Sequence, residues 1–213
     1  MWDSLINKNP LKTAMVLSII TIVYNIAEGI VSVIFGMNDQ TLALLGFGID
    51  SFVEVISGIG ILHLILRIKN SSAENRDKFE STALRITGFG FYFLTAGLVA
   101  GSVINLIQEN NPSTTLAGIV VSVISIITMY LLMKAKFQAG KKLNSDAVIA
   151  DAHCTKTCFN LSIILLFSSL LYQISSIGYF DILGSLGIAY YSFREGKESF
   201  EKAENNKLSC TCS

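Results

Sequence analysis

Six apolar stretches of about 20 residues, separated by short polar breaks, most constrain what this chain can fold into. A helix that spans a bilayer needs roughly 20 mainly apolar residues, and few residues remain here for a soluble domain. The sequence therefore predicts an all-α polytopic membrane protein with six transmembrane helices. The expected spans are residues 14–36, 42–66, 83–107, 115–133, 147–172 and 176–193.

Basic residues are found in every second break between the spans. All but one of the 16 Lys and Arg residues precede the first span, lie in or beside the second and fourth breaks, or follow the sixth span. Because Lys and Arg near span ends stay in the cytoplasm, both termini are predicted to be cytoplasmic. We expect residues 1–197 to form one transport domain and residues 198–213 a short cytoplasmic tail. The first apolar run is too long for a cleavable signal peptide.

Composition excludes two classes of protein. Lys plus Arg (16) equals Asp plus Glu (16), so there is no overall basic field to hold nucleic acid. Four Cys residues in 213 are too few for a secreted disulfide scaffold, and two of them lie in apolar segments.

Two pairs of potential metal ligands lie inside the spans. Asp50 and Glu54 are four residues apart, as are Cys154 and Cys158, so each pair shares a helix face with about 6 Å between its members. Counted from Arg67 and Lys142, both pairs lie roughly 21 to 22 Å deep, and they are expected to be level. Ionisable groups at mid-bilayer cost from about 2.5 kcal/mol upward and usually mark a pathway or site.

Two carboxylates and two thiols would supply the four ligands of a tetrahedral ion. Thiolates favour softer ions such as zinc, cadmium or Cu(I) over magnesium and calcium. Four deprotonated ligands would be strongly repulsive in an empty site, so metal binding is expected to release protons. For the Cys pair alone, packing as small hydrophobic side chains is the competing interpretation.

Other polar residues within the spans have more than one interpretation. Asn25, Glu28, Gly29 and Ser32 form a stripe along one helix face, which fits a helix contact or a transport path. Asp151 could stand at the mouth of the path, pair with Lys156, or act as a first-turn helix charge.

One lysine and two histidines also lie within the predicted spans. Lys156 faces away from both cysteines and is expected to pair with an acid such as Glu28 or to reach the interface. His153 is offset by one residue from the helix face that carries the cysteines, so it is less expected to contact the metal than they are. His63 lies near the inner end of its span and is expected at the membrane interface.

The chain ends in KLSCTCS, where Cys210 and Cys212 could chelate a soft metal. Two thiols alone make an incomplete site, so capture of metal by the tail and an incidental tail both remain open.

The segments NIAEGIVSVIFG, TLALLGFGIDSFVEV, SDAVIADAHCTKTC and FDILGSLGIAYYSFREG resemble the cation diffusion facilitators. That family carries an acid-xxx-acid pair on its second span, matched by Asp50 and Glu54. The family's fifth span has a pattern like A-D-A-L-H-x-x-S-D, and the segment ADAHCTKTC of this chain resembles it. In that alignment Cys154 takes the position of the His and Cys158 that of the last Asp. Asp181 resembles the acid that opens the sixth span.

The resemblance also implies an assembly. Typical relatives have a cytoplasmic ferredoxin-like domain after the sixth helix, whereas only 19 residues follow Arg194 here. We therefore expect a short form without that domain, and the resemblance implies a homodimer.

The expected function is a secondary transporter in a bacterial plasma membrane that exports a divalent transition metal, zinc or cadmium, in exchange for protons. Asp50, Glu54, Cys154 and Cys158 would bind the ion. Residues assigned to the pathway or to proton coupling are Asn25, Glu28, Asp151, His153, Lys156 and Asp181. Rivals are a metal sensor or regulatory subunit that uses Cys210 and Cys212, a channel, and an intramembrane enzyme. No HExxH or nucleophile elbow supports the enzyme, and neither an enzymatic activity nor a resident cofactor is expected.

Overall fold

The chain folds into a bundle of long helices. The structure is a computed structural model that describes residues 9–70, 78–108, 111–113 and 115–204. Over these residues it has six helices and no strand: α2 (Pro10–Asn38), α3 (Leu42–Asn70), α4 (Lys78–Gln108), α5 (Leu116–Leu143), α6 (Asp146–Ser175) and α7 (Tyr179–Glu204). Each corresponds to one predicted span, which confirms the all-α fold.

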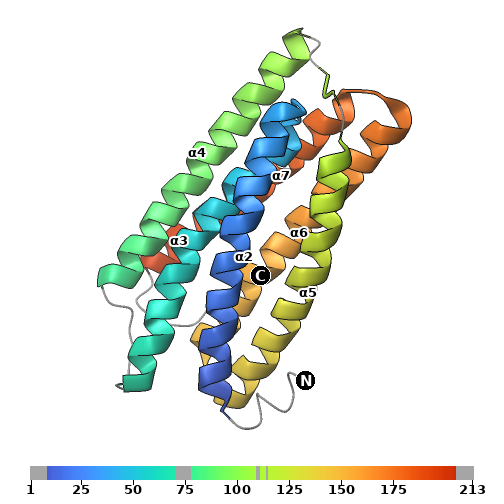
Figure 1. The fold of residues 1–213 in the computed structure, drawn as a ribbon. Helices are drawn as coiled ribbons and strands as arrows, with labels where there is room; N and C mark the ends of the chain where they lie inside the picture. Colours follow the sequence, from blue (N-terminus) through green and yellow to red (C-terminus); the bar gives the residue numbers. More distant parts are fainter. Residues whose placement is uncertain (1–8, 71–77, 109–110, 114, 205–213) are drawn as a thin grey trace.

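Five of the helices in the described part of the chain, α2 to α6, are long and apolar enough to cross a membrane. The last, α7, carries Asp181 near its start and both Arg194 and Glu195 in its second half, which makes it more polar. It nevertheless runs the length of the bundle beside α4 (Figure 1). The protein is therefore an all-α polytopic membrane protein.

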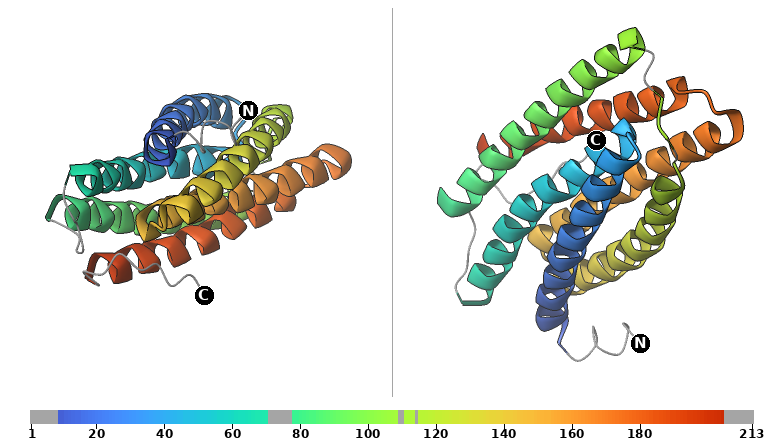
Figure 2. Two further views of the ribbon diagram at one scale, coloured as in Figure 1. Left: turned by 90° about the horizontal axis from the view of Figure 1, so that it is seen from below. Right: turned by 45° about the horizontal axis from the view of Figure 1, so that its top comes forward.

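Successive helices run in opposite directions, and α3 and α6 occupy the centre of the bundle (Figures 1 and 2). Helix α3 contacts α2, α4, α6 and α7, while α6 contacts α2, α3, α5 and α7. Helix α2 begins at the lower end of the bundle in Figure 1, and α7 ends toward that end. Side chains on the inner faces of α3 and α6 can therefore meet far from either end.

Two glycines allow α2 and α3 to approach closely. A Cβ atom on Gly36 would lie 2.6 Å from the backbone nitrogen of Leu45, and one on Gly48 would lie 2.8 Å from that of Val33. Neither backbone position leaves room for a side chain. This close packing brings the polar stripe of α2 against the face of α3 that carries Glu54.

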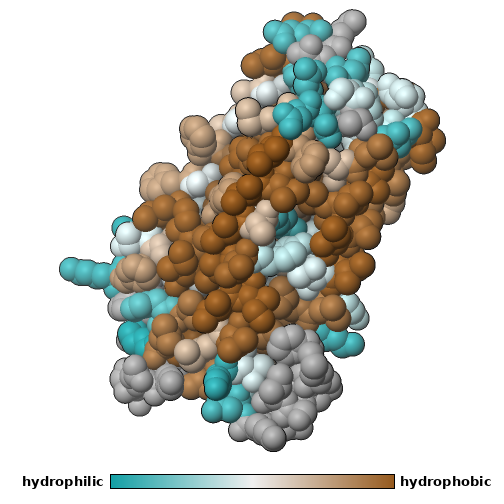
Figure 3. Space-filling model, viewed as in Figure 1, coloured by the Kyte–Doolittle hydropathy of each residue, from teal (hydrophilic) through white to brown (hydrophobic). Residues whose placement is uncertain are grey.

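The outer surface of the bundle matches a hydrocarbon environment. Figure 3 shows hydrophobic side chains over most of one face, with hydrophilic side chains gathered toward its two ends. Exposed apolar residues on this surface include Val23 and Ile30 of α2 and Ile124 and Ile127 of α5. Apolar surface of this extent is rare on soluble monomers and is typical of a surface that contacts lipid.

The boundary between α5 and α6 differs from the prediction. The polar run after Met133 was expected to form the break, but α5 continues to Leu143. The helix ends where Asn144 adopts a left-handed conformation with φ of 47°, and its backbone N–H bonds to the carbonyls of Gly140 and Lys141. Lys136, assigned to the break, is instead a fully buried residue of the helix.

Candidate metal centre

Three of the four predicted ligands lie buried between the central helices. Asp50 and Glu54 of α3 are 2% and 9% exposed, and Cys158 of α6 is 3% exposed. The four-residue spacing of the two acids puts both on the inner face of α3, as predicted.

The Glu54 carboxylate is the meeting point of three helices. Its Oε2 atom accepts a hydrogen bond from the Cys158 thiol of α6. The same oxygen accepts a bond from Nδ2 of Asn25 in α2, at 3.3 Å. A carboxylate, a thiol and an amide therefore converge deep inside the bundle.

The contact between Glu54 and Cys158 sets the register between α3 and α6. Since the helices run in opposite directions, Asp50 lies one turn to one side of this contact and Cys154 one turn to the other, each about 6 Å along the axis. The two pairs are therefore not level, and that prediction was wrong. Asp50 accepts a 3.1 Å bond from the hydroxyl of Ser192 in α7.

Cys154 has a different environment from Cys158. It packs against an apolar cluster that contains Ala14, Ile61 and Val148. Among the residues that the structure describes, no three His, Cys, Asp or Glu side chains are close enough together to hold a metal ion. The structure thus joins Glu54 with Cys158 but does not assemble the four predicted ligands.

The stripe on α2 faces this contact and carries unpaired oxygens. Glu28 accepts a 3.2 Å bond through Oε2 from the hydroxyl of Ser51. Its Oε1 atom and the Oδ1 atom of Asn25 have no hydrogen-bond partner among the described residues. Asn25 is 2% and Glu28 6% exposed. Buried oxygens without a protein partner are uncommon in folded proteins, so these two atoms are candidate contacts for a bound ligand. The hydroxyl groups of Tyr24 and Ser125 also interact with the Glu28 side chain.

Asp151 belongs to a buried ion pair. Its Oδ1 atom lies 2.9 Å from the ammonium of Lys136, and its Oδ2 atom accepts a 2.6 Å bond from Ser18. Lys136 also donates to Thr155 at 2.9 Å. The lysine partner is therefore Lys136 of α5 and not Lys156, and Asp151 lies beyond the first turn of α6. The network ties α2, α5 and α6 together on the predicted cytoplasmic side of Cys158.

Lys156 does not pair with Glu28. The lysine is exposed and lines a cavity of about 190 Å³ between α6 and α7, together with His153 and Glu195. The His153 ring lies edge-on to Phe137 with ring centroids 5.0 Å apart, away from the contact at Glu54. The ring of His63 packs against Phe79 at 4.7 Å.

Glu195 is an acid of this region that the sequence analysis overlooked. It accepts a 3.0 Å bond from Thr157, the neighbour of Cys158. It also interacts electrostatically with Asp50 and Glu54. Its place three residues after Ser192, on the same face of α7, was a signal that could have identified it.

Asp181 caps a helix at the opposite end of the bundle. Its two carboxylate oxygens accept bonds from the backbone N–H groups of Leu42 and Ala43, at 2.8 and 3.2 Å. These are the first two amides of α3, which have no partner within their own helix. An acid in this position also stabilises the helix dipole. Asp181 thus joins the start of α7 to the start of α3.

Replacing Asp181 with Ala is expected to lower the free energy of unfolding by about 2 kcal/mol, because two buried amides lose their acceptor. Unfolding followed by circular dichroism in detergent micelles measures this change. Asp181→Asn, which keeps one oxygen acceptor, should recover part of the loss. A stability equal to that of the wild type in Asp181→Ala would contradict the capping role.

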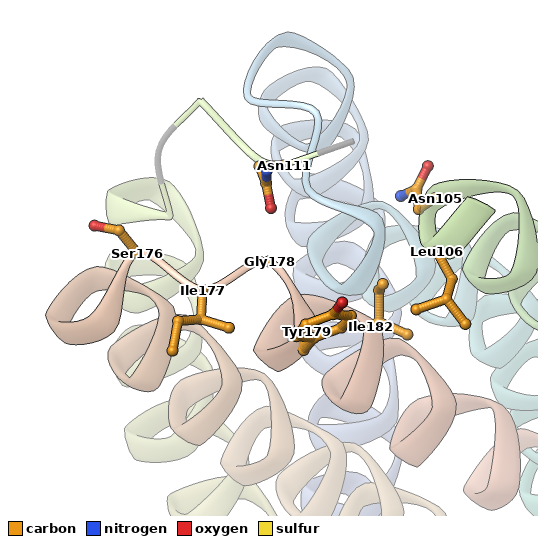
Figure 4. Close-up of a pocket in the computed structure, with 8 residues that line it drawn as sticks. All are labelled: Asn105, Leu106, Asn111, Ser176, Ile177, Gly178, Tyr179 and Ile182. Carbon is orange, nitrogen blue, oxygen red and sulfur yellow. The ribbon is translucent and has the colours of Figure 1, made fainter. Parts of the chain in front are cut away.

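A pocket of about 300 Å³ opens beside this cap, at the end of the bundle predicted to face outward. Figure 4 shows Asn105 of α4, Asn111, Ser176 of the α6–α7 turn and Tyr179 at the start of α7 around it. Its described lining carries no acidic, histidine or cysteine side chain. The pocket therefore offers no ligand set of its own.

Cys210 and Cys212, the tail residues predicted to capture metal, lie outside the described residues.

Comparisons with known proteins identify a family and a similar transporter. Residues 14–203 match the cation efflux transmembrane domain, which takes in all the residues discussed around Glu54. The chain is also similar to an uncharacterized transporter of Methanocaldococcus jannaschii, with 27% identity over 175 residues. The aligned segment is 80% of this chain and 62% of that relative, so the chain spans under two thirds of the relative's length.

Proposed function

The chain belongs to the cation efflux family, and from that premise we propose that it is a secondary transporter that exports zinc or cadmium from the cytoplasm in exchange for protons. The observation that carries the proposal is the buried contact between Glu54 and Cys158. An acid and a thiol in the interior of a membrane bundle are costly, and such groups mark ion pathways.

The chemistry of the two groups supports the choice of metal. A thiolate is a soft ligand that favours zinc and cadmium, whereas magnesium and calcium favour sites made of oxygen alone. We propose that Glu54 and Cys158 form the centre of the site. Asp50 and Cys154, the other two predicted ligands, lie one turn away on opposite sides.

The same contact supports proton exchange. The Cys158 sulfur and the Glu54 carboxylate are in contact, and two adjacent negative charges in the low-dielectric interior would repel, so we propose that the pair holds at least one proton when no metal is bound. Metal ligation requires the thiolate, and binding therefore releases this proton. Proton return would complete the cycle as the helices rock around the buried site and open it to alternate sides.

We further propose that the protein works as a homodimer in a bacterial plasma membrane. The pathway residues are proposed to be the polar groups next to the Glu54 contact, of which Asn25 and Glu28 are the nearest on α2. Because Asp151 is held by Lys136, we assign it to a buried ion pair on the predicted cytoplasmic side of the Glu54 contact.

The test is flux in proteoliposomes made with purified protein, with zinc or cadmium supplied on one side and a pH dye inside. We expect metal uptake with proton movement in the opposite direction. Control liposomes contain the same lipids without protein. Flux without opposing proton movement would favour a channel, and absence of flux of either metal from verified liposomes would reject the transporter.

A further inference from the structure

The expected ligand set draws on two helices, but in this conformation its members are separated. Asp50 and Cys154 each lie one helical turn from the contact between Glu54 and Cys158, in opposite directions. Asp50 is engaged by Ser192, and Cys154 packs in an apolar cluster. A metal ion seated at Glu54 and Cys158 needs further ligands from elsewhere.

Asn25 of α2 lies at the level of this contact, and Glu28 of the same helix lies one turn away from it, on the side of Asp50. Asn25 bonds to Glu54, and Glu28, one turn further along α2, bonds to Ser51, one turn back along α3. Both bonds obey one antiparallel register between the two helices. The α2 stripe is therefore aligned with the polar face of α3 over a full turn, and Gly36 and Gly48 keep the two helices close.

The α2 groups also have unused oxygen atoms. Oδ1 of Asn25 and Oε1 of Glu28 are buried without a hydrogen-bond partner among the described residues. Glu28 interacts electrostatically with Asp50, Glu54 and Cys158, which places it beside the centre. The hydroxyl groups of Tyr24 and Ser125 also interact with Glu28, but a carboxylate inside a membrane bundle stays unfavourable unless a cation comes to it.

We propose that Asn25 and Glu28 become direct ligands of the transported cation when the helices close on it, which makes the metal centre a three-helix site with Glu54 and Cys158. In the present conformation Glu28, Glu54 and Cys158 are not close enough together to hold an ion. This inference rests on the proposed function. The donor set is then one thiolate, two carboxylates and one amide oxygen, four in all, which suits a tetrahedral divalent ion. Two carboxylates and one thiolate more than balance the charge of a divalent cation.

Equilibrium binding of cadmium to purified protein in detergent tests the ligand set apart from transport. The ultraviolet absorption of the cadmium–thiolate bond reports ligation by cysteine, in a chain with Cys210→Ser and Cys212→Ser. We expect Glu28→Gln to weaken binding on the order of 10- to 100-fold, at least the loss caused by removing an outer-shell partner. Thr21→Val is the matched control and should bind as the wild type does, because Thr21 is buried on the same helix and its hydroxyl already donates to the Leu17 carbonyl.

Substitution of Asn25 distinguishes a ligand from a hydrogen-bond donor. Asn25→Leu should weaken cadmium binding by a similar factor, whereas Asn25→Asp keeps an oxygen ligand and should retain or strengthen binding. If Asn25 only donated to Glu54, Asn25→Asp would weaken binding, because it replaces a donor with a like charge. That result, or affinity like that of the wild type in both Glu28→Gln and Asn25→Leu, overturns the inference.

The three-helix site can fail while the proposed transport function stands. If the wild-type protein moves metal in liposomes while the α2 variants bind normally, the transporter stands and the three-helix site falls. If the wild type shows no binding of zinc or cadmium, both fall.

Discussion

Replacing Glu54 with Gln is expected to reduce cadmium transport by about 100-fold or more. Glu54 Oε2 is the atom that both Asn25 and Cys158 reach, so the substitution removes charge from the point where three helices meet. Glutamine has nearly the same size, but its amide cannot neutralise a divalent ion in a low-dielectric interior. Loss of an outer-shell group alone lowers metal affinity or activity by about 10- to 100-fold. Loss of the central ligand should therefore lower transport by at least about 100-fold.

The measurement is the initial rate of cadmium uptake into liposomes at equal protein content. Glu201→Gln is the matched control, because that carboxylate lies on α7 with its side chain 60% exposed and forms an exposed ion pair with Lys197. The control should transport as the wild type does. If Glu54→Gln transports within about twofold of the wild type while remaining folded, the centre does not lie at Glu54.

The second large effect concerns stability. Lys136→Met is expected to lower the free energy of unfolding by about 3 to 5 kcal/mol, because it leaves Asp151 as a buried charge without its cation. The side chains of this pair are 0% and 5% exposed. The double variant Lys136→Met with Asp151→Asn should recover most of the loss, since neither charge then remains.

Unfolding by a denaturing detergent, followed by circular dichroism, gives the free energies for this cycle. The control is Lys197→Met, which breaks an exposed ion pair with Glu201 whose side chains are 68% and 60% exposed. Exposed pairs of this kind contribute about 0.5 kcal/mol or less. A double variant no more stable than Lys136→Met would show that the buried pair is not the cause.

The number and order of the helices could be predicted because their apolar stretches are long and the breaks are short. The residue at which α5 ends could not be predicted in this way. Lysines in a polar run are normally solvated, and only the folded bundle shows that Lys136 has a buried acid to meet, 15 residues further along the chain.

The members of the candidate site could be predicted in part. Spacing put Asp50 with Glu54 and Cys154 with Cys158, and the contact between Glu54 and Cys158 follows from two inward faces meeting. The register was wrong because depth was counted from Lys142 as if it continued α6. Lys142 belongs to α5, and the chain turns after it, at Asn144.

The role of Asp181 was also beyond the sequence. An acid at the start of a helix normally interacts with its own first turn, and no pattern indicates that it will accept bonds from another helix 138 residues earlier in the chain. Its carboxylate could only be assigned to α3 once α7 had been placed beside it.

That cap would make the end of α3 that is predicted to face outward a pivot. With Leu42 held by Asp181, a motion of α3 that preserves both hydrogen bonds is a swing about its first turn. Glu54 lies twelve residues along, a lever arm of about 18 Å, so a swing of about 10° would carry its carboxylate about 3 Å. Such a displacement is enough to part Glu54 from the Cys158 sulfur while the outer end of α3 stays docked on α7.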